Sequence, residues 1–228
     1  MLLTIPQVLS SAATAELRAL LDGAGEAWVS GLATAGTQGA PVKHNEQIAE
    51  LSAVAAQGQA LVLAALEVHP QFISAALPGK VYPPLFNRYG PGMAFGPHVD
   101  GAIRLHPQTG EKLRTDLSAT LFLSDPAEYE GGHLQIMDTY GLQEIKLAAG
   151  DLVLYPATSL HQVTPVTRGR RQAAFFWVES LVRDAAQRAM LYDLDTAIQR
   201  LRQTSADRAA CDTLIGCYHN LLRQWAET

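Results

Sequence analysis

The sequence predicts an α+β chain in which a sandwich or jelly roll of short strands is flanked by helices at both ends. Between about residues 80 and 181, short apolar runs alternate with Gly, Pro and Asp, a pattern typical of sandwiches and jelly rolls. Before and after this zone, apolar residues recur at helical spacing. Hydrophobic residues make up 48% of the 228 residues, so the chain can bury a sizeable core.

We expect residues 1–78 to form a mainly helical support. Ser11 gives a cap-like start to an apolar stripe that begins at Leu17. A second helical pattern covers about residues 47–66. The Gly/Ala/Thr-rich stretch between them, residues 31–41, is interpreted as loop or strand.

Residues 79–182 are expected to form the jelly-roll core, and residues 183–228 a helical C-terminal extension. The extension carries two apolar stripes at helical spacing, which must be buried against the barrel or against a second copy of the chain in a homo-oligomer. The core strands are expected near residues 85–89, 119–123, 132–137, 152–155, 161–166 and 173–178.

Composition narrows the classes of partner. The formal charge is −5 and no Lys/Arg cluster occurs, which argues against nucleic acid as a partner because phosphate binding needs grouped cations. No apolar run approaches the roughly 18 residues of a membrane-spanning helix. The two cysteines, Cys211 and Cys217, have no partner cluster, and the N-terminus lacks a basic leader region. We therefore expect a cytoplasmic protein with reduced thiols.

A candidate metal site begins with His98 and Asp100. Alternate residues of an extended segment share one face, so both side chains can point at one ion. His161, in a later expected strand, offers a third ligand. Two histidines and one carboxylate on one face of a metal form the facial triad of non-haem Fe(II) oxygenases.

Arg171 lies ten residues beyond His161, at the start of a strongly apolar strand. A guanidinium that enters a barrel there needs a carboxylate partner, because an unpaired buried charge is very costly. The planar fork of arginine binds a carboxylate at two points. A 2-oxo acid could therefore chelate the metal at one end and place its distal carboxylate on Arg171.

The ordered motifs resemble the PKHD-type hydroxylases, which include PiuC-like iron-uptake factors and belong to the prolyl-4-hydroxylase branch of 2-oxoglutarate dioxygenases. The resemblance covers essentially the whole chain. It rests on Asn87-Arg88-Tyr89-Gly90, His98-x-Asp100, Arg114-Thr115-Asp116-Leu117-Ser118, Tyr129-x-Gly131-Gly132-x-Leu134, Gly150-Asp151, His161, Arg171 and Phe176-Trp177.

The resemblance implies a double-stranded β-helix core and hydroxylation that uses Fe(II), 2-oxoglutarate and O₂, with L-ascorbate keeping the iron reduced. It assigns iron to His98, Asp100 and His161, and 2-oxoglutarate to Arg171, with Tyr89 as a second donor. The substrate stays open among a peptide, an amino-acid derivative and a siderophore, and the link to iron uptake rests on the resemblance alone.

Two other functions could use the same three ligands: a zinc-dependent hydrolase, or a non-catalytic metal- or siderophore-binding jelly roll. Both leave Arg171 unexplained. Residues 43–45 either contact the substrate or form a solvated loop. Residues 101–118 either contact the substrate or form a salt-bridged loop. We expect Phe175, Phe176 and Trp177 to be packing residues.

Overall fold

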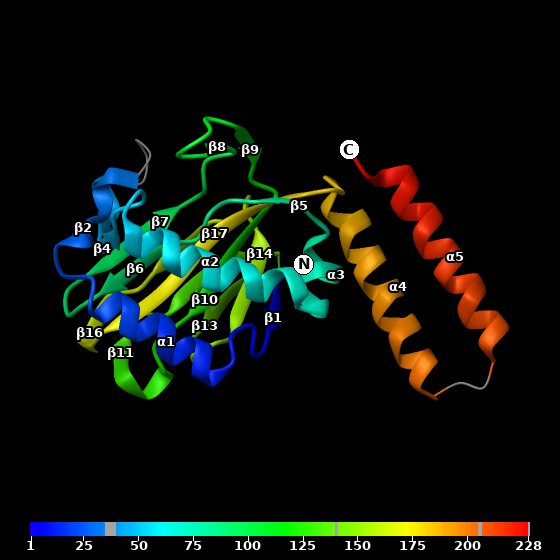
Figure 1. Cartoon of the computed structure of the whole chain (residues 1–228), viewed down its shortest axis with the longest axis horizontal. Coiled ribbons are helices and arrows are strands. Elements are labelled where there is room, and N and C mark those ends of the chain that lie inside the picture. The colour runs from blue at the N-terminus through cyan, green and yellow to red at the C-terminus, as the bar shows by residue number, and fades with distance from the viewer. Residues whose placement is uncertain (35–39, 140, 205–206, 228) are drawn as a thin grey trace.

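The computed structural model describes residues 1–34, 40–139, 141–204 and 207–227. Most of the strands in these residues belong to two antiparallel sheets (Figure 1). The larger sheet has the order β1 (Leu3–Ile5), β14 (Leu152–Pro156), β10 (Leu117–Phe122), β17 (Arg171–Ser180), β6 (Leu85–Tyr89), β4 (Glu46–Ile48) and β2 (Trp28–Ser30), with β5 (Pro78–Val81) paired to β17. The smaller sheet has the order β13 (Gly141–Ile145), β12 (Leu134–Asp138), β15 (His161–Val163), β7 (Ala94–His98) and β3 (Lys43–His44).

Two short antiparallel ribbons complete the strands. They are β11 (Tyr129–Gly131) with β16 (Val166–Gly169), and β8 (Ile103–Leu105) with β9 (Lys112–Arg114). The helices are α1 (Ser11–Asp22), α2 (Ala53–Val68), α3 (Pro70–Ala76), α4 (Ala185–Thr204) and α5 (Arg208–Trp225), with 3₁₀ turns at Gly25–Ala27, Gly31–Thr34, Ala40–Val42 and Pro126–Glu128. The predicted jelly-roll core with flanking helices is confirmed.

The N-terminal region is less helical than the sequence suggested. The pattern over residues 47–66 becomes helix only from Ala53, where the side chain of Ser52 caps α2 by accepting from the Ala55 amide. Residues 46–48 instead form β4, because their backbone pairs with β2 and β6. Of the stretch predicted as loop or strand, residues 35–39 lie outside the described part, and the rest includes 3₁₀ turns.

The principal apolar core lies between the larger sheet and the helices that cover its outer face (Figure 1). Leu17 of α1 and Leu66 of α2 belong to one buried cluster with Phe86 and Phe176 of the sheet. A second cluster, which includes Tyr89, fills the space between strands of the two sheets. Because both faces of the larger sheet are covered, its register is strongly specified.

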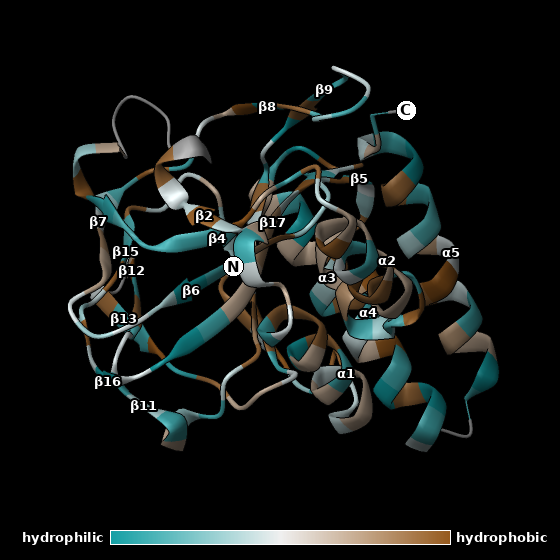
Figure 2. Cartoon of the chain, turned by 60° about the vertical axis from the view of Figure 1, so that its left-hand side comes forward, coloured by the Kyte–Doolittle hydropathy of each residue, from teal (hydrophilic) through white to brown (hydrophobic). Residues whose placement is uncertain are grey.

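The C-terminal helices form a pair beside the end of the sheet domain (Figure 1). Leu191 of α4 is fully buried with Leu77 and Val182. Figure 2 shows apolar segments of α4 and α5 turned toward the rest of the chain and hydrophilic segments turned outward. No helix in the described part of the chain is long and apolar enough to cross a bilayer.

Candidate metal centre and its cavity

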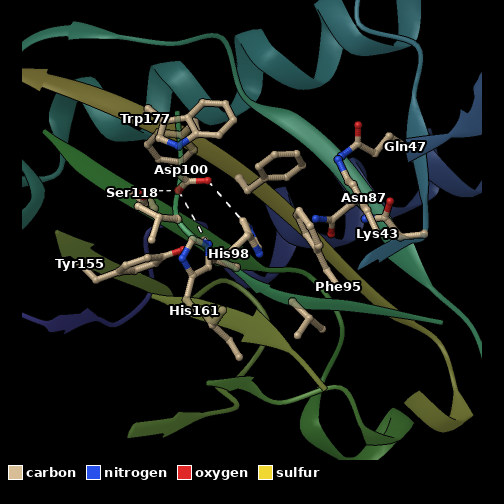
Figure 3. A pocket seen from close by; sticks show the side chains of 18 of the residues that line it. Lys43, Gln47, Asn87, Phe95, His98, Asp100, Ser118, Tyr155, His161 and Trp177 are labelled. Carbon is tan, nitrogen blue, oxygen red and sulfur yellow. Dashed lines mark hydrogen bonds and ion pairs between the residues drawn. The ribbon is translucent and has the colours of Figure 1, made fainter. Parts of the chain in front are cut away.

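Three side chains that the sequence singled out meet at one point inside the jelly roll. One ligand atom each from His98, Asp100 and His161 lies within 4.8 Å of the other two. The Asp100 oxygens lie 4.0 Å from His98 Nε2 and 3.8 Å from His161 Nε2. Figure 3 shows the three side chains pointing toward one another.

Strand register brings the two histidines together. His161 on β15 is the direct partner of His98 on antiparallel β7. Directly opposed side chains on one face of such a pair have Cβ atoms about 4.5–5.5 Å apart. The two imidazole centroids accordingly lie 4.2 Å apart.

The histidines are oriented by their own backbone. His98 Nδ1 lies 2.8 Å from the Gly96 carbonyl oxygen, and His161 Nδ1 lies 3.0 Å from the Ser159 carbonyl oxygen. A ring that donates through Nδ1 keeps the Nε2 lone pair for a metal. Burial, and next the neighbouring His161, lower the pKa of His98 to about 4, so this ring is neutral at physiological pH.

Asp100 is positioned by a residue for which the sequence predicted no role. The Ser118 hydroxyl donates to Asp100 Oδ2 at 2.6 Å. Ser118 lies on β10, opposite Tyr155 and Trp177 of the flanking strands. The sequence places this serine in one of the family motifs but gives no sign that it reaches Asp100, because only the sheet order brings β10 under the cluster.

The cluster opens into a cavity of about 270 Å³ between the two sheets. The lining includes, besides the cluster, Lys43, Asn45, Gln47, Asn87, Tyr89, Phe95, Arg104, Ser118, Tyr155, Arg171, Phe175 and Trp177. Phe175 and Trp177, expected only to pack, therefore line the cavity. Phe176 lines it as well and also packs edge-on against Phe72 of α3.

Arg171 is one of the most deeply buried side chains in the chain, at 1% exposure. Its guanidinium carbon lies 5.4 Å from the Tyr89 ring centroid and 5.2 Å from that of Phe122. Within the described residues, its Nε and Nη1 have no hydrogen-bond partner. A buried cation with unpaired donors is costly unless a ligand supplies the missing acceptors.

Tyr89 is the cross-strand partner of Arg171. Burial raises the pKa of the Tyr89 hydroxyl, while the Arg171 charge acts in the opposite direction. The phenol therefore stays protonated at physiological pH and can donate a hydrogen bond. Gly132 lies against the Arg171 side chain, since a Cβ built there would lie 3.2 Å from Arg171 Cδ.

The sequence did not decide whether residues 43–45 and 101–118 reach the site, and the structure places the two segments differently. Lys43 and Asn45 are buried and line the cavity, whereas His44 between them is exposed. Gln47 continues the same alternation into the cavity. This residue was expected to lie in the second helix, although the Lys-x-Asn-x-Gln period was a usable signal for a strand.

Within residues 101–118, Arg104 lines the cavity. Arg114 instead forms a two-point ion pair with Asp116, at 2.8 and 3.1 Å, and a further ion pair with Glu227. Asp116 also accepts from the Ser180 amide. The Arg114–Asp116 pair is therefore structural and fastens the chain end to the sheet.

The donor set fits Fe(II) and 2-oxoglutarate. Two imidazole nitrogens and one carboxylate converge from one side, which leaves ligand positions open toward the cavity. Arg171 lines the same cavity, and its unpaired Nε and Nη1 could donate to the distal carboxylate of a 2-oxo acid.

Comparisons with known proteins agree with this chemistry. Residues 84–179 match the 2OG-Fe(II) oxygenase superfamily, and residues 185–227 match the PKHD-type hydroxylase C-terminal domain. Relatives described as PKHD-type hydroxylases in Cupriavidus metallidurans and Burkholderia ambifaria are each 65% identical over the full length of both chains. A crystal structure of a Pseudomonas putida prolyl-4-hydroxylase has 18% identity and a TM-score of 0.55, and the match covers 78% of this chain and 92% of that one. That structure supports the fold.

Proposed function

The chain belongs to the PKHD-type hydroxylases, which are Fe(II)- and 2-oxoglutarate-dependent dioxygenases, and we propose that His98, Asp100 and His161 hold its iron. Bound iron, 2-oxoglutarate and O₂ supply the oxidising chemistry, in which 2-oxoglutarate becomes succinate and CO₂ while one oxygen atom enters a C–H bond of the substrate. Ascorbate is the reductant typical of the family. The chain's own residues bind, orient and shield the reactants.

The proposed iron ligands are held in place by their neighbours. The Gly96 and Ser159 carbonyls fix the histidine rings, and Ser118 fixes the carboxylate. Such outer hydrogen bonds keep ligands oriented and tune their basicity. The stacking of Phe95 on His98, at 3.6 Å between ring centroids, shields one face of that ring from water.

Arg171 carries the proposal for the co-substrate. Its guanidinium is almost fully buried, and its Nε and Nη1 donors have no partner among the described residues, which suits this side chain to bind a carboxylate. We assign it the distal carboxylate of 2-oxoglutarate, with the Tyr89 hydroxyl as a second donor. A zinc hydrolase or a metal-storage module would need no such anchor.

The substrate class remains a peptide, an amino-acid derivative or a siderophore, and the family resemblance alone carries a link to iron uptake. We further propose a division into a support region of residues 1–78, a catalytic core of residues 79–182 and a C-terminal extension of residues 183–228. A cytoplasmic protein without nucleic-acid or membrane partners agrees with the charge of −5 and the two free cysteines. The C-terminal helices are the surface we propose for any homo-oligomer contact.

Anaerobic addition of 2-oxoglutarate to the iron-loaded protein tests the site assignment. Chelation by the 2-oxo acid should produce the weak visible metal-to-ligand charge-transfer band. Zinc-loaded protein is the matched control and should give no band. If the band forms equally well in the Arg171→Ala variant at low 2-oxoglutarate concentration, the proposed anchor is wrong.

A further inference from the structure

A second tyrosine, Tyr129 of the Tyr-x-Gly-Gly motif, lies beside Arg171. Tyr129 on β11 is the direct partner of Gly169 on β16, and Arg171 follows Gly169 by two residues at the start of β17. Diagonal neighbours across an antiparallel pair lie about 7–8 Å apart, within reach of aromatic and long side chains. The β11–β16 ribbon therefore brings the Tyr129 ring to the end of the larger sheet where Arg171 enters the cavity (Figure 1).

Gly132 shows how close the two side chains are. A Cβ built on Gly132 would lie 3.1 Å from Tyr129 Cε2 and 3.2 Å from Arg171 Cδ. The edge of the phenol ring and the stem of the arginine therefore both lie against the face of Gly132 that carries no side chain. Its φ of 61° favours glycine at this position, so the contact is built into the motif.

Both side chains carry buried polar atoms without partners. Tyr129 and Arg171 are each 1% exposed. In the described part of the chain, the Tyr129 hydroxyl has no hydrogen-bond partner, and neither have Arg171 Nε and Nη1. Leaving a buried polar group unpaired is costly. A phenol oxygen accepts and a guanidinium N–H donates, so the unpaired groups of the two side chains are complementary.

Lys146 restrains the tyrosine. Its Nζ donates to the Tyr129 carbonyl oxygen at 2.7 Å and lies 4.0 Å from the Tyr129 ring centroid. A cation over the face of a phenol ring is attracted by the ring electrons. The ring is thus held at its backbone and on one face, which limits the directions in which the hydroxyl can point.

The phenol is electrically suited to support a cation. Burial raises the pKa of the Tyr129 hydroxyl, while the Arg171 charge acts in the opposite direction, so the phenol stays protonated at physiological pH. A neutral oxygen can accept from the guanidinium without cancelling the positive charge that a carboxylate ligand needs. Tyr129 is not among the described residues that line the cavity, so its influence on a ligand passes through Arg171.

We propose that Tyr129 is a positioning residue for 2-oxoglutarate: in the complex, Arg171 Nη1 donates one of its two hydrogens to the Tyr129 hydroxyl, which fixes the guanidinium plane for the distal carboxylate. This inference rests on the proposed role of Arg171. A guanidinium has five N–H groups, so four remain available. Two parallel bonds to a carboxylate form together only when the plane of the fork is correctly set.

Tyr129→Phe tests the proposal, because it removes the hydroxyl and keeps the ring. 2-Oxoglutarate is titrated anaerobically into the iron-loaded protein, with the charge-transfer band as the readout. Affinity should fall by about tenfold or more, as expected for loss of a hydrogen bond to a charged group, while iron stoichiometry stays normal. Tyr82→Phe is the matched control and should equal the wild type, because Tyr82 is also buried, donates to Glu50 and lies outside the cavity lining in the described residues.

Three further measurements separate an effect on Arg171 from an effect on the fold. 2-Oxobutyrate has the same chelating end but no distal carboxylate, so it should bind equally to Tyr129→Phe and the wild type. In the Arg171→Ala background, Tyr129→Phe should cause no further loss of 2-oxoglutarate affinity, because the two residues act as one unit. The unfolding temperature without 2-oxoglutarate should not fall in Tyr129→Phe, since the lost hydroxyl has no partner among the described residues.

Unchanged 2-oxoglutarate affinity in Tyr129→Phe overturns the proposal. An equal loss for 2-oxobutyrate, or a loss that persists in the Arg171→Ala background, overturns it as well, because the effect would then not pass through Arg171 and the distal carboxylate. Failure of the underlying function has a different signature: the wild type would give no charge-transfer band with 2-oxoglutarate, or Arg171→Ala would bind 2-oxoglutarate as tightly as the wild type.

Discussion

Arg171 and Tyr89 face each other across the paired strands β17 and β6, with the guanidinium carbon 5.4 Å from the phenol ring centroid. Both side chains are 1% exposed. A fully buried cation beside a protonated phenol offers hydrogen-bond donors to one carboxylate.

The first prediction follows from this pair. Arg171→Ala should bind iron nearly normally but lose about 10²- to 10³-fold in 2-oxoglutarate affinity, because removing one partner of a buried ion pair costs roughly 3–5 kcal/mol. Arg171→Lys should recover only part, since it keeps the charge and loses the fork. A titration of 2-oxoglutarate into the anaerobic iron-loaded variants measures both.

Arg170 and Arg168 are the controls for this experiment. Their side chains are 55% and 68% exposed and lie near Asp22 and Glu130, so Ala at either position should change 2-oxoglutarate affinity little. A larger loss in Arg170→Ala than in Arg171→Ala would move the anchor and contradict the assignment.

The second prediction concerns the metal. His98→Ala, Asp100→Ala and His161→Ala should each abolish tight iron binding and hydroxylation, because each removes one of three protein ligands. His44→Ala is the control, because it removes an exposed histidine near the cavity that is not a proposed ligand. Iron is measured per chain after desalting, and a His161→Ala protein that still retains one iron would rule out the third ligand.

The third prediction tests Ser118 as a positioning residue. Ser118→Ala removes the 2.6 Å hydrogen bond to Asp100 and should lower iron affinity about 10- to 100-fold. Ser124→Ala is the matched control, because Ser124 is equally buried and bonds only to backbone groups of β17 and its preceding turn. Equal iron affinity in the two variants would show that the Ser118 hydroxyl has no effect on the metal.

The fourth prediction concerns Gly132, which has a φ of 61°. An Ala there would place its Cβ 2.9 Å from Val166 Cγ2 and 3.2 Å from Arg171 Cδ. It should destabilise the fold by about 1–3 kcal/mol and weaken 2-oxoglutarate binding more than iron binding. Gly92→Ala has a similar φ of 80° with nothing within 4 Å, so it separates backbone strain from displacement of Arg171. Equal 2-oxoglutarate affinity in both variants would contradict this role.

The fifth prediction separates the C-terminal helices from the site. Leu191→Ala should lower the free energy of unfolding by about 2–5 kcal/mol, because it leaves a cavity at a fully buried position. The neighbouring Met190 is 52% exposed, and its Ala variant should change stability little. Iron stoichiometry should stay normal in both, and its loss in a folded Leu191→Ala protein would contradict a purely supporting role.

Local sequence determined much of this molecule. The alternation of an extended segment predicts His98 and Asp100 on one face, and the two side chains do converge although β7 ends at His98. The apolar strand that follows Arg171 by itself indicates that this side chain is buried. The run at residues 85–89 coincides with β6, and both C-terminal stripes lie on helices. These features depend on residues close in the chain, so their patterns can be read directly from the sequence.

Tertiary structure decided the remainder of the site. Ser118 reaches Asp100 because β10 lies between β14 and β17, and Lys43 reaches the cavity because β3 extends the smaller sheet. Gln47, assigned to a helix from its spacing, joins a strand once β2 and β6 offer backbone partners. Sheet order and register follow from burying apolar faces contributed by distant segments, and the local pattern around one residue carries no information about which strand will lie beside it.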